Sequence, residues 1–297
     1  MFTADIMVAA AQENALSTQP LDLHSLEMKA DAGDSDAQLQ LGVLYLGNYT
    51  IEADSLRAVG YLQRAADNGN LEAMYDLGIC YICGSQAVAR NTERGISLVR
   101  RAAENGFPIA QTCMGKICEQ GTPCFLYSPH AKYPLCPIQM LKEAGGFLGC
   151  GGEAYGVVPY LKNDADALRW FTLAADSGEP AAMNELVRIY AKGECGATID
   201  LRKSLDWLMR AAKNDISDAQ CRLGRYYLDG YQNFLDPDSR KALEWFIRAA
   251  DNGSADGAAN AAAIYCGIGT QLQPNLTLAV YYSMRAANAF EGFNDKV

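Results

Sequence analysis

Apolar and small residues recur along this chain at the spacing of a helix face, and one short phrase repeats them in register. In each copy a large residue stands four positions before the first of two alanines, and a small residue stands seven positions before the same alanine. The first alanines of the six copies are Ala65, Ala102, Ala174, Ala211, Ala249 and Ala286. They lie 37 or 38 residues apart, apart from one interval of 72. Such positions share one side of a helix, and a fixed period in this range predicts stacked helical repeats.

Each phrase is predicted to end a helix of about three turns. Eleven residues before the first alanine the chain always has Asp or Asn, whose side chains cap the free N–H groups of a first helical turn. These predicted N-caps are Asp54, Asn91, Asn163, Asp200, Asp238 and Asn275. We expect the small residues to admit a close neighbouring helix, and the large residue four before the alanines to fill the space beside them.

Another helix is predicted before each of these, so that every period holds a first and a second helix. The first helices share the frame Ala-x-x-x-Leu-Gly-x-x-Tyr, as in 37–45, 73–81 and 219–227. Glycine inside a helix costs about 1 kcal/mol relative to alanine, so its recurrence needs a packing reason. We therefore expect two backbones to touch at this glycine position.

The frame and the phrase together resemble the Sel-like repeat (SLR) family, which is related to the tetratricopeptide repeats. The resemblance covers residues 22–290 and implies an all-α fold, a right-handed α/α superhelix of about six helix-turn-helix repeats. Val187 and Ala262 replace the frame's glycine, Cys118 its tyrosine, Leu98 the aromatic residue of the phrase, and Asp215 a glycine at its end.

The regular pattern bounds three segments. Residues 1–21 are predicted to be an N-terminal capping segment, residues 22–290 the solenoid, and residues 291–297 a frayed end. The solenoid is irregular at about 122–157, which is rich in glycine and proline. Either this stretch is an insertion into one repeat, or it is a degenerate repeat with a second helix over 137–144.

Composition narrows the class of partner. The chain has 35 acidic and 25 basic residues, a net charge of −10, which argues against nucleic acid or an anionic membrane as partner. No apolar run reaches the ~20 residues of a membrane span. The first residues do not read as a signal peptide, and the ten cysteines form no regular disulfide pattern across the two helices of a unit. We expect a cytoplasmic protein; the alternative is an exported one whose signal is absent from this sequence.

The sequence offers few candidates for catalytic or metal-binding residues. Cys80 and Cys83 form a CxxC pair, but no second pair or histidine cluster completes a zinc site. His130 lies in the irregular stretch among cysteines whose spacing fits no known template. We therefore predict no catalytic residues, no metal and no cofactor.

The predicted function rests on the surface. The resemblance to tetratricopeptide repeats implies that first helices line a concave groove, with side chains six and three before the glycine position, and one and four after it, pointing inward. These positions hold an apolar set early in the chain and cations later. The predicted partner-binding residues are Tyr75, Ile79, Ile82, Lys116, Asn184, Arg188, Lys192 and Arg225, with Glu119 beside Lys116. Exposed Tyr and Arg are common interface anchors.

We therefore predict a non-enzymatic adaptor or scaffold that binds an extended or helical protein segment with an apolar anchor and acidic residues. The resemblance implies the same kind of role, since Sel-like repeat proteins commonly assemble complexes. The alternative is a hydrolase, or a sensor of cell-wall or other glycan fragments, that uses the 122–157 stretch around His130.

Overall fold

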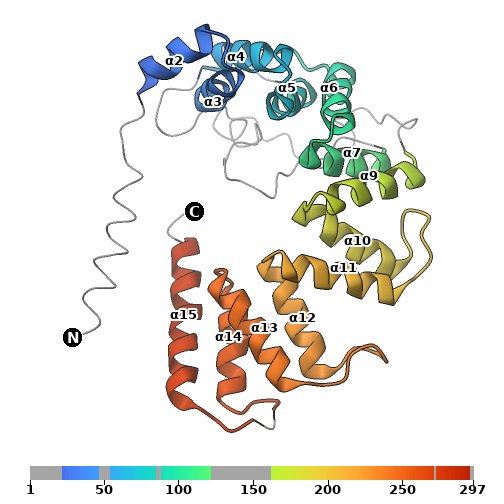
Figure 1. Cartoon of the computed structure of the whole chain (residues 1–297), viewed down its shortest axis with the longest axis vertical. Helices are drawn as coiled ribbons and strands as arrows, with labels where there is room; N and C mark the ends of the chain where they lie inside the picture. The colour runs from blue at the N-terminus through green and yellow to red at the C-terminus, as the bar shows by residue number, and fades with distance from the viewer. Residues whose placement is uncertain (1–21, 47–53, 85–87, 122–161, 271, 295–297) are drawn as a thin grey trace. The chain divides into compact units, whose positions relative to one another are not determined.

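The computed structural model describes residues 22–46, 54–84, 88–121, 162–270 and 272–294, and this part of the chain is helical throughout (Figure 1). Its only strand-like feature is one bridge, between Tyr231 and Leu235. The helices are α2 (Leu23–Asp31), α3 (Ser35–Tyr45), α4 (Ser55–Asp67), α5 (Leu71–Cys83), α6 (Thr92–Glu104), α7 (Pro108–Gln120), α9 (Asp164–Asp176), α10 (Pro180–Lys192), α11 (Leu201–Lys213), α12 (Ser217–Asp229), α13 (Ser239–Asp251), α14 (Ala255–Tyr265) and α15 (Leu276–Asn294). The fold is an all-α solenoid of about six repeats, as predicted.

The described helices belong to two compact units that divide within α6. Unit 1 contains α2 to α5 and α6 up to Leu98; unit 2 begins at Val99 and contains the rest of α6 and all later helices. The predicted capping segment, residues 1–21, lies outside the described residues, whereas α2 begins at the side-chain cap of Asp22. At the other end α15 remains helical to Asn294, beyond residue 290.

All six predicted N-caps of the second helices are confirmed. Each side chain accepts a hydrogen bond from a backbone N–H two or three residues later, as at Asp54, Asn91, Asn163, Asp200, Asp238 and Asn275. The bond satisfies a donor that the helix itself cannot use. Asp215, which replaces a glycine after α11, also keeps a positive φ of 59°.

One backbone hydrogen bond joins the two helices of every pair. The N–H of the second helix's N-cap donates to the carbonyl oxygen at the tyrosine position of the first helix. The distances are 2.9 Å for Asp54 to Tyr45, 2.8 Å for Asn91 to Tyr81, 2.8 Å for Asn163 to Cys118, 2.8 Å for Asp200 to Tyr190, 2.6 Å for Asp238 to Tyr227 and 2.8 Å for Asn275 to Tyr265. The pairing of α7 with α9 is thus the same as in the other repeats. The predicted insertion or degenerate repeat falls in the chain between them, where residues 122–161 lie outside the described residues.

The space beside the small residues is filled by a different side chain from the one predicted. The residue three before the alanine, not four before it, is completely buried at Leu62, Val99, Phe171, Leu208 and Phe246. It stands four positions after the small residue, so it lies on the same side of the helix. The predicted aromatic residue instead lies under an arginine, as at Trp207, whose ring is 4.5 Å from Arg210 Cζ.

The recurrent helical glycine has the packing reason that its cost requires. A Cβ at Gly224 would lie 2.7 Å from the Phe246 ring, and one at Gly115 2.7 Å from the Phe171 ring. The expectation of backbone contact was therefore wrong here, because an aromatic ring occupies the position. Backbones do meet in unit 1, where a Cβ on Gly95 would lie 2.5 Å from the carbonyl oxygen of Gly78.

A buried glutamine links consecutive repeats, a feature that the sequence pattern did not reveal. Its Nε2 donates to the carbonyl eight residues earlier, at the end of the preceding second helix: Gln38 to Ala30 at 2.8 Å, Gln111 to Ala103 at 3.1 Å and Gln220 to Ala212 at 3.0 Å. At two of the three, an asparagine that ends the next second helix donates to the glutamine oxygen: Asn68 to Gln38 at 3.0 Å and Asn252 to Gln220 at 2.9 Å. These bonds satisfy carbonyls that a helix end leaves open.

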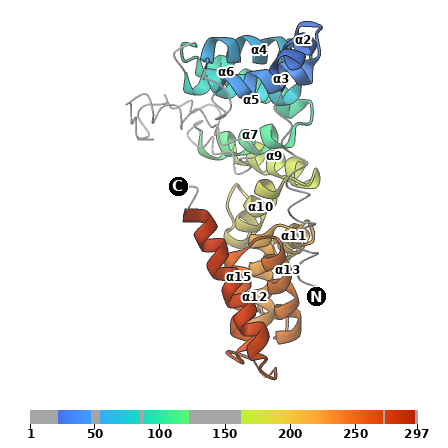
Figure 2. The ribbon, with the colours of Figure 1, turned by 90° about the vertical axis from the view of Figure 1, so that its left-hand side faces the viewer.

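The last four helices run beside one another, as Figures 1 and 2 show. Their core is made of alanines from α13, α14 and α15 around Phe246, Ile264 and Tyr282. Leu243 and Ile247 of α13 pack against this core from its edge. The second helices α11 and α13 are thus each covered by the first helix that follows, and α15 is the last of the described helices.

Candidate functional site

The predicted binding residues of unit 1 are buried, which corrects their assignment to an open groove. Ile82 is 0% exposed, Ile79 7% and Tyr75 8%. A fully buried Ile82 packs in the core and cannot contact a partner. The resemblance to tetratricopeptide repeats predicted which way these side chains point, but not whether they are exposed. Exposure depends on everything that packs around the helix.

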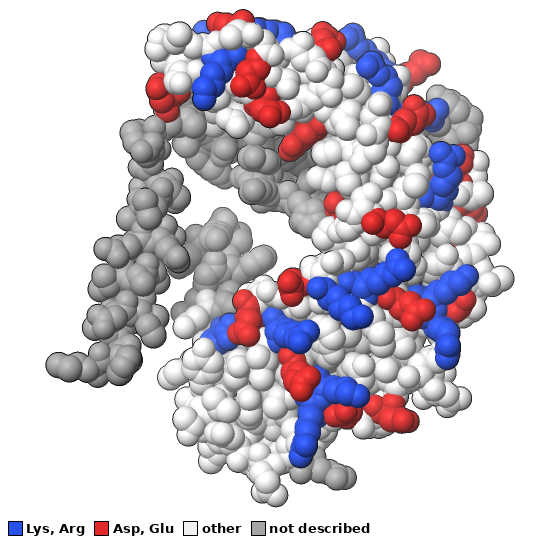
Figure 3. Space-filling view, in the orientation of Figure 1, with Lys and Arg blue, Asp and Glu red and all other residues white. Residues whose placement is uncertain are grey.

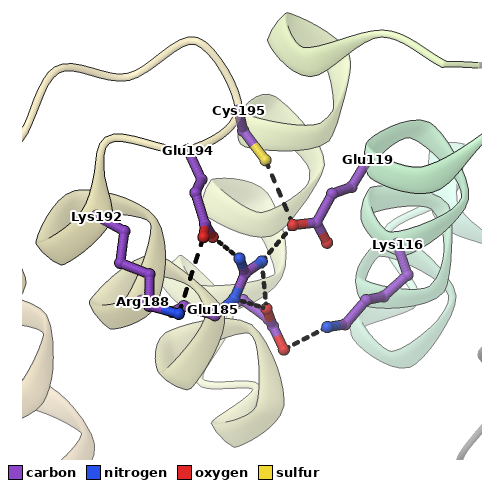
Figure 4. A network of polar contacts seen from close by, with 7 residues as sticks. All are labelled: Lys116, Glu119, Glu185, Arg188, Lys192, Glu194 and Cys195. Carbon is purple, nitrogen blue, oxygen red and sulfur yellow. Dashed lines mark hydrogen bonds and ion pairs between the residues drawn. The ribbon is translucent and has the colours of Figure 1, made fainter.

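In unit 2 the chain after α10 folds back toward that helix. Gly193 ends α10 in the left-handed conformation, with φ of 71°, and its N–H donates to the Ile189 carbonyl at 2.8 Å. Cys195 and Gly196 follow with φ of 50° and 70°. The resulting tight turn returns the side chains of Glu194 and Cys195 to the face of α10 that carries Arg188 (Figure 4).

Arg188 is at the centre of a network of charged side chains from α7, α10 and this turn (Figure 4). Its guanidinium donates from Nε to Glu185 at 2.9 Å and forms ion pairs with Glu119 of α7 and Glu194 of the turn. Lys116 Nζ donates to the other oxygen of Glu185 at 2.5 Å. Three carboxylates therefore surround one arginine, and Lys116 supplies a second cation.

The network shifts the pKa values of two of its own groups, Arg188 and Cys195. Partial burial alone would lower the pKa of Arg188, but hydrogen bonds to Glu119 and Glu185 outweigh it, and the pKa is raised. Burial, reinforced by the Glu119 carboxylate 3.8 Å from its Sγ, raises the pKa of Cys195 to about 11. The Cys195 thiol is therefore protonated at neutral pH, which is the opposite of what a nucleophilic cysteine needs.

The network also changes the role of the predicted cations. Lys116 and Arg188 were expected to attract an acidic partner, yet both are satisfied by carboxylates of the same chain. Glu185 could have been anticipated from its place three residues before Arg188 on one helix. Glu194 and Cys195 could not, because they reach the site through a turn.

Two of the cations predicted to bind a partner are exposed in the structure. The Lys192 side chain is 64% exposed and its Nζ stands 3.9 Å from Glu194, beyond hydrogen-bond distance. Arg225 of α12 is exposed and forms no ion pair with another described residue. Asn184 is half-buried, and its side-chain oxygen accepts no hydrogen bond from the described part of the chain. These three residues make up the "first-helix face" of unit 2.

The alternative site has no structural counterpart in the described ranges. His130 and the 122–157 stretch lie outside them. Among described residues, no group of three His, Cys, Asp or Glu side chains is arranged to hold a metal ion. None of the described helices combines the length and the apolar character that crossing a membrane would take.

Proteins with regulatory and binding names are similar to parts of this chain. Chitin synthase regulatory factor 3 of Schizosaccharomyces pombe is 26% identical over 217 residues, 72% of this chain and 19% of that protein. DAP3-binding cell death enhancer 1 of Mus musculus is 40% identical over 81 residues, 27% of this chain and 15% of that protein. The chain thus spans less than a fifth of the length of either relative.

Solved structures share the fold. The c5321 protective antigen of uropathogenic Escherichia coli, which displays an SLR fold, superposes with a TM-score of 0.62 at 24% identity, over 90% of this chain and 49% of the other. A Sel1 repeat protein from Oxalobacter formigenes gives a TM-score of 0.56 at 21% identity, over 86% and 85%.

The family model for the Sel1 repeat matches six segments of the chain. They are residues 35–70, 71–107, 147–179, 180–216, 217–254 and 255–289. Together they account for most of the sequence. Five of them each span one helix pair, whereas the segment 147–179 contains α9 but not α7. The chain belongs to the Sel1 repeat family.

Proposed function

We propose that this protein is a non-enzymatic adaptor that binds another protein through the first-helix face of unit 2. Sel1 repeat proteins are generally protein-interaction scaffolds. The names of the relatives, a regulatory factor and a binding enhancer, belong to proteins of this kind. The proposal extends that general role to a particular surface of this chain.

Arg225 is the observation that supports the choice of surface. Arg188 and Lys116 are neutralised by the carboxylates of Glu119, Glu185 and Glu194. Arg225 is exposed on an acidic chain without such a partner among the described residues, so a carboxylate from outside would find it unoccupied. Charge-assisted hydrogen bonds from arginine to carboxylate are among the stronger polar contacts at interfaces.

The other residues of this surface indicate what else a partner segment would carry besides a carboxylate. Leu228 lies one helical turn after Arg225 and is partly buried against the last core, so it offers an apolar edge beside the cation. Lys192 of α10 supplies a second exposed cation on another first helix. The partner segment that fits is acidic and carries an apolar residue.

The test compares two exposed arginines. A photocrosslinking benzoylphenylalanine is placed at position 225 on α12, or at Arg240 on second helix α13, and the protein is illuminated in its source cells. We expect one defined protein to be crosslinked from position 225 and not from position 240. Binding of that protein, measured by calorimetry, is expected to weaken at least tenfold with Arg225→Glu and to be unchanged with Arg240→Glu. Equal crosslinking from both positions, or binding that survives Arg225→Glu, would contradict the proposal.

A further inference from the structure

The last helix presents an apolar stripe to the outside. On α15, Leu276 is 70% exposed, Val280 56%, Met284 63% and Tyr281 52%. The first three stand four residues apart and form one ridge along the helix. The small, exposed Ala287 follows Met284 by about one turn, and Thr277 and Ser283 lie beside the ridge, so the stripe holds no charged side chain.

The earlier second helices show what normally happens to these positions. One repeat before Val280 and Met284 the chain has Leu243 and Ile247, which pack against the core formed with the following helices. Two repeats before Val280 it has Leu205, which is only 5% exposed. The ridge on α15 is thus the surface by which each second helix receives its neighbour, left uncovered on the described chain.

A helix face that meets only water normally carries polar and charged residues. The outer face of α15 is unusual in its lack of charge as well as in its apolar side chains. From Leu276 to Asn288 the one charged residue is Arg285. It is already engaged, donating to Asp251 at 2.8 Å and to the Ala250 carbonyl at 2.7 Å. In Figure 3 the surface over α14 and α15 is almost free of charged side chains, in contrast with the mixed charges over the earlier helices of unit 2.

We propose that α15 packs against α15 of a second copy of this chain, about a two-fold axis. Two chains of net charge −10 repel one another almost everywhere, and this acid-free stripe lets two copies approach without opposing like charges. A two-fold interface must be complementary to itself. A ridge of residues spaced by four satisfies that condition, because two such ridges interdigitate when the helices cross at about −50°.

The small size of the stripe sets the expected strength. Stable interfaces use 20–30 residues a side, and this one offers a single helix face, so we expect a weak dimer with a Kd on the order of 10 µM. Since no ion pair is involved, raising the salt concentration is not expected to dissociate it. This inference is independent of the first-helix face, and Arg225→Glu is expected to leave the dimer intact.

The test is sedimentation velocity of the full chain between about 1 and 200 µM. We expect the sedimenting mass to rise with concentration from 32.2 kDa toward twice that value, and the double variant Val280→Glu, Met284→Glu to stay monomeric throughout. The matched control is the double variant Met28→Glu, Leu56→Glu, which adds the same two charges at apolar side chains that are 63% and 72% exposed on α2 and α4; it is expected to dimerise like the wild type. A wild-type chain that stays monomeric at 200 µM, or a dimer unaffected by the double variant, would overturn the proposal.

A crosslink identifies what covers the stripe. With benzoylphenylalanine at position 280, illumination of the dimer is expected to join two copies through peptides that both contain residues 276–288. A crosslink from position 280 to a different protein, or to another segment of this chain, would also overturn it.

Discussion

Asp76 of α5 shows how a single half-buried carboxylate makes stability depend on pH. Burial, and secondarily the neighbouring charge of Glu72, raises the pKa of Asp76 to about 7. Below the unfolded pKa of about 3.8 both states are protonated and nothing is lost. Between pH 3.8 and about 7 the unfolded state has released the proton that the folded state still holds, so stability falls across this range and levels off above it.

We predict that Asp76→Asn stabilises the protein at pH 8 by about 1–3 kcal/mol, because asparagine keeps the shape and cannot ionise. The gain should shrink as pH falls from 8 to 5. Urea unfolding of wild type and variant at both pH values measures it, with Asp229→Asn, an exposed carboxylate on α12, as the control that should show no such trend. A gain that is the same at both pH values would rule out titration of Asp76 as its cause.

Residues whose role is local were predictable from the sequence, and residues whose role depends on distant chain were not. The N-caps were correct at every position because an Asp or Asn satisfies N–H groups two or three residues away. The exposure of Ile82 was wrong because no local pattern reports what packs over a side chain. The pairing of Arg188 with Glu119 joins residues 69 apart in sequence, and nothing in either helix alone points to the other.

At the scale of helices, the glycine of the first helix and the large residue of the second form a matched pair. Gly224 accepts Phe246 and Gly115 accepts Phe171, whereas Val187 stands in the repeat that has Leu208. Gly42, however, accepts Leu62, so the glycine makes room for an aromatic ring without requiring one. The repeat pattern predicted the glycine, but not what fills the space that it leaves.

We predict that Gly224→Ala destabilises the protein by about 1–3 kcal/mol, because its Cβ would lie 2.7 Å from the Phe246 ring. Phe246→Leu alone should also destabilise, by a similar amount, by leaving a cavity. The double variant should cost less than the sum, since alanine then occupies part of that space. Thermal unfolding of the four proteins gives the coupling energy, and strict additivity would mean that the two side chains do not compete for the same space.

At the scale of the whole molecule, the period in the sequence was sufficient to predict an all-α solenoid and its family, but not a partner. Each repeat contributes the same contacts, so six copies of a weak pattern reinforce one another. A binding surface is made once and has no copies to confirm it. Arg225 and the stripe on α15 were identified because their side chains remain exposed in the folded chain. Exposure of a side chain depends on its three-dimensional surroundings, which the sequence pattern does not report.

A solenoid made of neighbour contacts should also lose stability locally. The described helices contact chiefly those just before and after them in the chain. Arg188→Ala would leave Glu119, whose side chain is only 16% exposed, without its cation, and Glu185 with Lys116 alone. Because an unpaired carboxylate of this kind is costly and this one is partly hydrated, we predict a loss of about 1–3 kcal/mol at the α7–α10 junction.

Hydrogen exchange measured by mass spectrometry shows where that loss falls. We expect faster amide exchange in α7, α9 and α10 of the Arg188→Ala protein, a smaller effect in α11, and none in α3 and α4 of unit 1, because nearest-neighbour coupling weakens with each repeat crossed. Lys192→Ala, which removes an exposed cation 3.9 Å from Glu194, should leave the whole pattern unchanged. If the variant instead exchanged faster by the same factor in every helix, the chain would unfold as one cooperative body, and the repeats would be coupled far more strongly than their neighbour contacts imply.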